Sequence, residues 1–318
     1  MSDTTGSFQF MNQASESSLF RNGRVLIERD SAGNTASSTG IELDTHQLKV
    51  VDARLLSGPA QLTCEVNGFE LLQSPVVGDI DFLDHQSVVR DYYGQCERLV
   101  QLNTEAEVFA FDHNIRSARG NAARATIKGG QDVQGPAHVV HGDYTLRSAP
   151  ERVQQLARPP SGNDTLQGFI EEGASVVPES LAQEVQDGRR FAIINVWRNI
   201  VDEPVETHPL ALCDAATVVP DDLVVFELHY PDRVGENYFS KAAAAHKFYY
   251  YPHMTRDEAL LIKQWDSFGA LATSNGVHQD NPGEVCTFSF HSAFHPDDGR
   301  LEAPDRWSIE VRCIVIYP

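Results

Sequence analysis

The chain has 318 residues, and 41% of them are hydrophobic, so it can bury a sizeable core. Its formal net charge of -20 repels phosphate backbones and anionic lipids, which argues against a nucleic-acid partner and against membrane docking. No apolar run is long enough to cross a bilayer, no signal peptide is evident, and the five cysteines are scattered. We therefore expect a cytoplasmic protein with reduced, mostly buried cysteines.

In chain order, residues 1–18 are polar and predict a flexible tail, and residues 19–318 predict a single domain without repeats or a clear linker. Short segments rich in Val, Ile, Phe and Tyr predict strands at 108–112, 137–140, 191–197, 223–230, 248–251, 286–290 and 308–317. Helices are predicted at 80–101, 178–186 and 257–263, the last with Thr255 as its N-cap. This pattern favours a mainly β fold with flanking helices, namely a double-stranded β-helix of the jelly-roll, cupin-like type.

One His-x-Asp pair stands at the end of a predicted strand. His141 and Asp143 follow the apolar segment 137–140, and residues two apart on a strand share a face. An imidazole and a carboxylate side by side can hold two adjacent positions of a divalent metal, as in the two-His, one-carboxylate centres of non-haem iron(II) oxygenases. The two other pairs, His278/Asp280 and His295/Asp297, lie in turn-like segments and fit this geometry less well.

The third ligand and an anion-binding arginine are expected near the C-terminus. His291 follows the predicted strand 286–290, with His295 as its main rival. Arg306 and Ser308 come shortly after it, where a guanidinium can bind the distal carboxylate of 2-oxoglutarate through two parallel hydrogen bonds and the serine can add a third. Arg312 and Arg300 are the competing arginines.

These motifs, in this order, resemble a known family. The segments that carry the resemblance are FDHNIR (111–116), HGDYT (141–145), NVWRNI (195–200), PLALCDA (209–215), FYYYPHMTRDEALLIKQWDS (248–267), FHSAF (290–294) and RWSIEVR (306–312). They resemble the 2-oxoglutarate/iron(II) oxygenases with a double-stranded β-helix. Within these, they resemble the secondary-metabolism group of the gibberellin desaturase, the AsaB-type hydroxylase/desaturases and the cephem methoxylase component. The resemblance covers roughly residues 105–318.

The resemblance implies an oxidoreductase, a 2-oxoglutarate-dependent dioxygenase that uses Fe(II), 2-oxoglutarate and O2. It would act on a small-molecule secondary metabolite by C–H abstraction, giving hydroxylation, desaturation or cyclisation. His141, Asp143 and His291 would bind the metal, and no further catalytic residue is implied. Two alternatives stay open: a different metal-dependent cupin-type enzyme, and an accessory subunit of an oxygenase pair. The sequence also allows a homo-oligomer.

Further residues are assigned to the neighbourhood of the metal. Arg306, Ser308 and Asn195 are expected to bind the co-substrate. Tyr250, Arg198 and Trp307 are expected to contact the substrate, although a structural role competes for Arg198 and Tyr250. Trp307 stands where a glutamate is common in the family.

Overall fold

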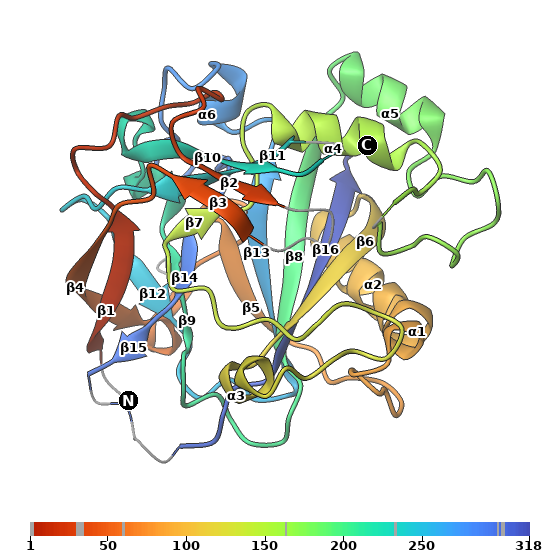
Figure 1. Cartoon of the computed structure of the whole chain (residues 1–318), viewed down its shortest axis with the longest axis horizontal. Helices are drawn as coiled ribbons and strands as arrows, with labels where there is room; N and C mark the ends of the chain where they lie inside the picture. Colours follow the sequence, from red (N-terminus) through yellow and green to blue (C-terminus); the bar gives the residue numbers. More distant parts are fainter. Residues whose placement is uncertain are drawn as a thin grey trace.

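The computed structural model describes residues 3–29, 35–58, 61–162, 164–231, 234–297, 299 and 303–318. Its strands form one sheet of eleven strands and one of five, which lie side by side with helices at their margins (Figure 1). Among the described residues, no helix is both long and apolar enough to cross a membrane. All five cysteines are buried and free, as predicted.

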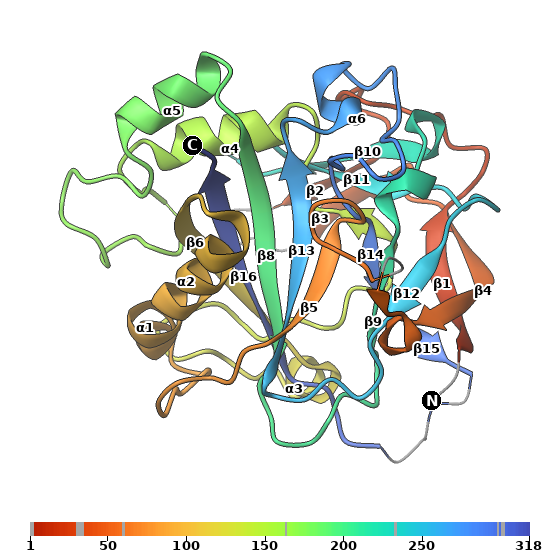
Figure 2. The same cartoon turned by 180° about the vertical axis from the view of Figure 1, so that it is seen from behind.

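The five-stranded sheet is antiparallel throughout. Its order is β5 (Phe69–Gln73), β13 (Glu258–Asp266), β8 (Phe191–Asn199), β16 (Ser308–Ile316) and β6 (Glu107–Arg116). The helical segment α1 (His85–Ser87), η3 (Val88–Tyr92) and α2 (Tyr93–Thr104) covers its outer face (Figure 2). The inner face is turned toward the larger sheet, so every residue of β8 and of β13 is buried.

The eleven-stranded sheet is mixed, because β12 pairs with β4, and β10 with β2, in parallel. Its order is β15 (His295–Pro296), β1 (Thr4–Met11), β4 (Leu43–Asp52), β12 (Phe248–Tyr250), β9 (Leu210–Cys213), β14 (His291–Ala293), β7 (His141–Gly142), β11 (Val234–Ser240), β10 (Leu223–His229), β2 (Leu26–Arg29) and β3 (Thr35–Thr39). The short strands β7, β9 and β14 lie at its centre and carry the candidate site.

The remaining helices are short. They are α3 (Ala118–Ala122), α4 (Ser148–Leu156), α5 (Glu179–Gln186), α6 (Ala270–Thr273) and the 3-10 turns η1 (Ala53–Leu55), η4 (Ala215–Thr217) and η5 (Pro220–Asp222). Helices α4 and α5 pack their apolar faces, through residues such as Val153 and Leu181, on the main core cluster. The predicted mainly β fold with flanking helices is therefore confirmed.

The expected flexible tail is wrong for residues 4–11, which form β1. Its full length pairs with β4, and Phe8, Phe10 and Met11 are buried. Gly6 lets β15 approach closely, because a Cβ there would lie 2.6 Å from the carbonyl oxygen of His295. The polar composition of the segment hid its alternating apolar residues, which the strand buries on one face.

The helix predicted at 257–263 is also wrong, since residues 258–263 form the first part of β13. The capping contact exists: the backbone N–H of Thr255 donates to Glu258 Oε2 at 2.9 Å, but it closes a turn that leads into the strand. Pairing with β5 on one side and β8 on the other outweighs the local helix signal. By contrast, α5 and the segment α1 to α2 fall where helices were predicted.

Candidate metal centre and adjoining pocket

Three predicted ligands meet at the centre of the large sheet. His141 opens β7 and is paired directly with His291, which opens β14, so both imidazoles lie on the same face with ring centroids 4.4 Å apart. Asp143 follows β7, and its Oδ1 lies 3.6 Å from His141 Nε2. The ligand atoms of the three side chains all lie within 4.8 Å of one another. This is the arrangement of a two-His, one-carboxylate facial site.

Neighbouring groups orient the triad. His141 Nδ1 lies 2.7 Å from the carbonyl oxygen of Val139, which can only accept, so Nδ1 carries the proton and Nε2 keeps its lone pair for a metal. Asn195 Nδ2 donates to Asp143 Oδ2 at 3.0 Å, and the guanidinium of Arg312 lies 3.5 Å from the same oxygen. These contacts leave Asp143 Oδ1 turned toward the two imidazoles.

The electrostatics favour the protonation states that bind metal. Burial, reinforced by His291, lowers the pKa of His141 to about 4, and burial also lowers the pKa of His291. Burial alone would raise the pKa of Asp143, but Arg312 and the two imidazoles outweigh it and hold that pKa well below its usual range. At neutral pH the site therefore presents two neutral imidazoles and one carboxylate, which is a donor set that fits iron(II).

A second group of charged residues lies on the inner face of the small sheet. Arg306, just before β16, is only 2% exposed; its Nη1 donates to the carbonyl oxygen of His208, and its Nε has no partner among the described residues. Arg116 at the end of β6 donates to the carbonyl oxygen of Gly135 and is paired in register with Ser308. Burial and the charge of Arg116 lower the pKa of Arg306 to about 9.

Neither of these two guanidiniums forms an ion pair with a carboxylate within the part of the chain that the structure describes. Buried charges are normally compensated by a partner. The buried Arg306 and the half-buried Arg116, beside the hydroxyl of Ser308, therefore form a site suited to an anion, and carboxylates bind guanidinium particularly well.

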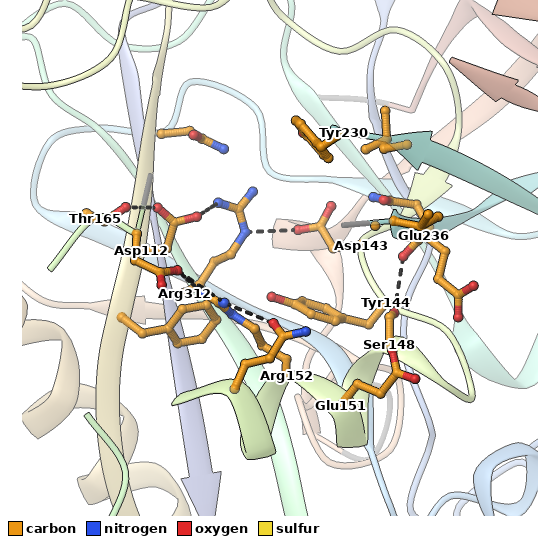
Figure 3. Close-up of a pocket in the computed structure, with 18 of the residues that line it drawn as sticks. Asp112, Asp143, Tyr144, Ser148, Glu151, Arg152, Thr165, Tyr230, Glu236 and Arg312 are labelled. Carbon is orange, nitrogen blue, oxygen red and sulfur yellow. Dashed lines mark hydrogen bonds and ion pairs between the residues drawn. The ribbon is translucent and has the colours of Figure 1, made fainter. Parts of the chain in front are cut away.

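A cavity of about 380 Å³ opens beside the triad. Figure 3 shows Arg312 reaching between Asp112 and Asp143 at its floor, and Arg312 Nη1 lies 2.8 Å from Asp112 Oδ2. The walls come from β6, α4, β11 and the segments after β7 and β10, and they include Tyr144 and Arg152. Most lining side chains are polar, so the cavity offers hydrogen bonds as well as space.

A family model described as an oxidoreductase/YMDC permease-like domain matches residues 8–316. The chain belongs to this family. Among its relatives is a protein encoded in the dcmA 3′ region of Methylophilus leisingeri, 43% identical over 194 residues, which cover 60% of this chain and 88% of that protein. Another is the alpha-ketoglutarate-dependent dioxygenase phiK of a fungal species, 28% identical over 286 residues, covering 86% of this chain and 85% of phiK. A third is the hydroxylase/desaturase efuI of Hormonema carpetanum, 27% identical over 301 residues, covering 89% and 88%.

The fold of this oxidoreductase family member matches a solved structure along nearly its whole length. The iron and alpha-ketoglutarate-dependent endoperoxidase NvfI superposes with a TM-score of 0.70 at 22% identity, covering 99% of this chain and 98% of that one. The jelly-roll fold predicted from the sequence is therefore confirmed. So are the predicted resemblance to the iron(II)/2-oxoglutarate oxygenases and the predicted enzyme class, and the relatives favour neither the other cupin-type enzyme nor the accessory subunit.

The rival residues lie elsewhere. His295 is an exposed member of a different histidine group and does not join the triad. Arg312 contacts Asp143 and so is a neighbour of the triad, whereas Arg300 lies outside the described residues. The carboxylate of Asp280 accepts from the backbone N–H groups of Leu271 and Thr287, and that of Asp297 accepts from the Thr5 hydroxyl, so neither His-x-Asp rival forms a ligand pair.

The structure contradicts all three predicted substrate contacts. Arg198 alternates with Asn195 and Trp197 along β8, lies on the outer face and donates to Tyr92 Oη and the carbonyl oxygen of Arg256. Trp307 also lies on the outer face, packed against Gly120 of α3.

Tyr250 is wrong by one position. It packs edge-on against Phe294 in the core, whereas Tyr249 pairs with Leu212, which in turn pairs with His291, and so shares the face of the ligand. Successive side chains of a strand point to opposite faces, so a shift of one residue moves a side chain to the other face of the sheet. Composition alone does not tell which of the two faces Tyr250 occupies.

Two charged residues of the inner face were not among the predicted site residues. Arg116 pairs in register with Ser308, and Glu310 lies between Ser308 and Arg312 on β16, with Arg312 Nη2 donating to its Oε1 at 3.3 Å. Burial and the charge of Asp143 raise the pKa of Glu310. For Glu310 the available signal was its period-two spacing with Ser308 and Arg312, whereas the position of Arg116 requires knowledge that β6 and β16 are neighbours.

Proposed function

We propose that this chain is an iron(II)- and 2-oxoglutarate-dependent oxygenase that binds the metal through His141, Asp143 and His291. The observation that carries the proposal is the convergence of these three side chains in metal-binding protonation states. Asn195 and Arg312 support it by holding the Asp143 carboxylate in place. Iron(II), when bound with 2-oxoglutarate and O2, supplies the oxidising power for C–H abstraction.

We infer that Arg306, Ser308 and Arg116 hold the distal carboxylate of 2-oxoglutarate. A dianionic co-substrate would compensate the buried guanidinium of Arg306 and the half-buried one of Arg116, with which no carboxylate of the described chain pairs. Arg116 also connects this group to the metal centre, because its charge lowers the pKa values of both His291 and Arg306. Asn195, predicted to bind the co-substrate, contributes mainly through Asp143, while its buried Oδ1 has no partner in the described structure and remains available as an acceptor.

The polar cavity beside Asp143 is our candidate substrate chamber. Its volume of about 380 Å³ suits a small molecule. Arg152, which also lines the cavity, lies over the ring of Phe111, 5.0 Å from its centroid, and pairs with Asp164 at 3.4 Å. We propose a small substrate with several hydrogen-bonding groups, as in secondary metabolism, and oxidation by hydroxylation, desaturation or cyclisation. The chain's own task is to fix the substrate carbon near the metal and to exclude water.

The deciding experiment is anaerobic titration of the metal-free protein with iron(II) and 2-oxoglutarate. The weak visible charge-transfer band of the iron chelate is expected in the wild type and is expected to be lost in Asp143→Ala and His291→Ala. His278→Ala serves as the control, because this histidine lies on an exposed loop. An equal band in wild type and Asp143→Ala, or no band in any variant, would contradict the proposed metal site.

A further inference from the structure

A second histidine cluster lies outside the proposed iron centre. It consists of His138, before β7, His208, before β9, and His295, which opens β15. One ring nitrogen from each lies within 4.8 Å of the others. The ring centroids of His138 and His295 are 4.3 Å apart, and that of His208 lies 5.1 Å and 4.9 Å from them.

Strand pairing in the large sheet brings the second histidine cluster together. Because β7 and β14 run antiparallel, His141 pairs with His291, and the chain before β7 runs beside the chain after β14. The backbone N–H of Ala293 donates to the carbonyl oxygen of Ala137, which places His138 beside the start of β15. These neighbouring segments therefore carry two histidine pairs. His141 and His291 lie at the proposed iron centre, and His138 and His295 lie just before β7 and just after β14.

We propose that His138, His208 and His295 form a second metal site, which binds a zinc-type divalent cation through three imidazoles and leaves a fourth position open. Three nitrogen donors without a carboxylate suit zinc, and also cobalt, nickel or copper, better than iron(II). Its three ligands are separate from the three proposed iron ligands.

The chemical state of the rings supports the site. Burial lowers the pKa values of His138 and His208 to about 4, with neighbouring charges reinforcing the shift, so both imidazoles are neutral at physiological pH. The Nδ1 atoms of both are buried without a partner among the described residues. Buried polar atoms normally find a hydrogen-bond partner, and a cation would satisfy them.

Only a small adjustment is needed. Tetrahedral zinc binds imidazole nitrogens at about 2.0–2.1 Å, so the donor atoms must move closer than they are now. The rings of His138 and His295 are nearly parallel, at 4°, and one must turn toward the shared ion. His295 is exposed and can rotate without disturbing the core.

His208 connects this cluster to the co-substrate end of the oxygenase site. It has a positive φ of 47°, which is uncommon for a residue with a side chain, and its carbonyl oxygen accepts from Arg306. A metal bound to the ring of His208 would hold this conformation and so make His208 a positioning residue for Arg306.

The test is titration of tag-free, metal-free protein with cobalt(II), followed by calorimetry and by visible absorption. The wild type is expected to bind two equivalents, and His295→Gln and His208→Gln one each, with affinity at the lost site reduced about 100-fold or more. The double variant Asp143→Ala/His291→Ala is expected to keep one equivalent, which displays the absorption of a low-coordinate cobalt site and is displaced by zinc.

The control and the contrary outcomes are distinct from those of the proposed function. His278→Gln, another exposed histidine, is expected to keep both equivalents, and circular dichroism checks that each variant is folded. A second equivalent that survives both His295→Gln and His208→Gln would overturn the proposal, as would a double variant that binds no cobalt. If the wild type shows no iron chelate band but still binds cobalt at the cluster of His138, His208 and His295, only the proposed oxygenase site is refuted.

Discussion

Replacing Arg306 by lysine tests the co-substrate site most directly. The lysine keeps a positive charge but cannot form two parallel hydrogen bonds to a carboxylate. In the structure the guanidinium has one donor engaged with the carbonyl oxygen of His208 and a buried Nε without a described partner, so at least one charge-assisted bond to the ligand is lost. Such a bond contributes about 1.5–3 kcal/mol. The dissociation constant of 2-oxoglutarate should therefore rise by roughly 10-fold to 150-fold.

The assay is anaerobic titration of 2-oxoglutarate into the iron-loaded protein, with the charge-transfer band as readout. Arg198→Lys is the matched control, because Arg198 is equally buried but lies on the outer face of the same sheet. It should lower the melting temperature and leave the affinity for 2-oxoglutarate unchanged. An unchanged affinity in Arg306→Lys, or an equal loss in Arg198→Lys, would refute the assignment of the inner face as the binding surface.

Four further outcomes are expected. Asp143→Asn should lower iron(II) affinity about 100-fold or more, measured by metal titration, because it removes the only carboxylate of the triad. His141 should contribute a loss on the order of 3 kcal/mol to the unfolding free energy of the metal-free protein as the pH falls from 6.5 to about 4, since it stays neutral when folded while the unfolded chain takes up a proton; in urea unfolding, His141→Gln should show a pH-dependent loss smaller than the wild type by about this amount. Asp266→Ala should cost about 3–5 kcal/mol in unfolding free energy, because the buried Lys263, 2.9 Å from Asp266, loses its closest partner. Trp307→Leu should cost about 1–3 kcal/mol and leave the affinity for 2-oxoglutarate unchanged, because this side chain packs on the outer face; a weaker affinity would count against that placement.

Errors in the sequence analysis share a cause. The segment 257–263 carries a capping contact at Thr255 and good helix formers, yet it is β13, because its neighbours β5 and β8 are distant in sequence. Tyr250 lies on a correctly predicted strand, Arg198 lies on β8 just beyond the predicted segment, and Trp307 immediately precedes β16, but none of the three faces the triad. Composition located several of the strands, whereas the buried face of each strand follows from packing.

Local chemistry was enough to predict the mainly β fold, and it singled out His141, Asp143 and His291, which the structure brings together. The co-substrate role of Arg306 and Ser308 stays a prediction. A metal and a dicarboxylate each require particular side chains. For this reason the residue types in the His-x-Asp pair, the later histidine and the Arg-x-Ser motif are themselves informative about the function. Only the tertiary structure brought Arg116 beside Ser308 and placed Glu310 and Asn195 around Asp143. It also gathered His138, His208 and His295 into one cluster. These neighbours come from different strands, and the pairing of strands far apart in the chain is set by the packing of the whole core.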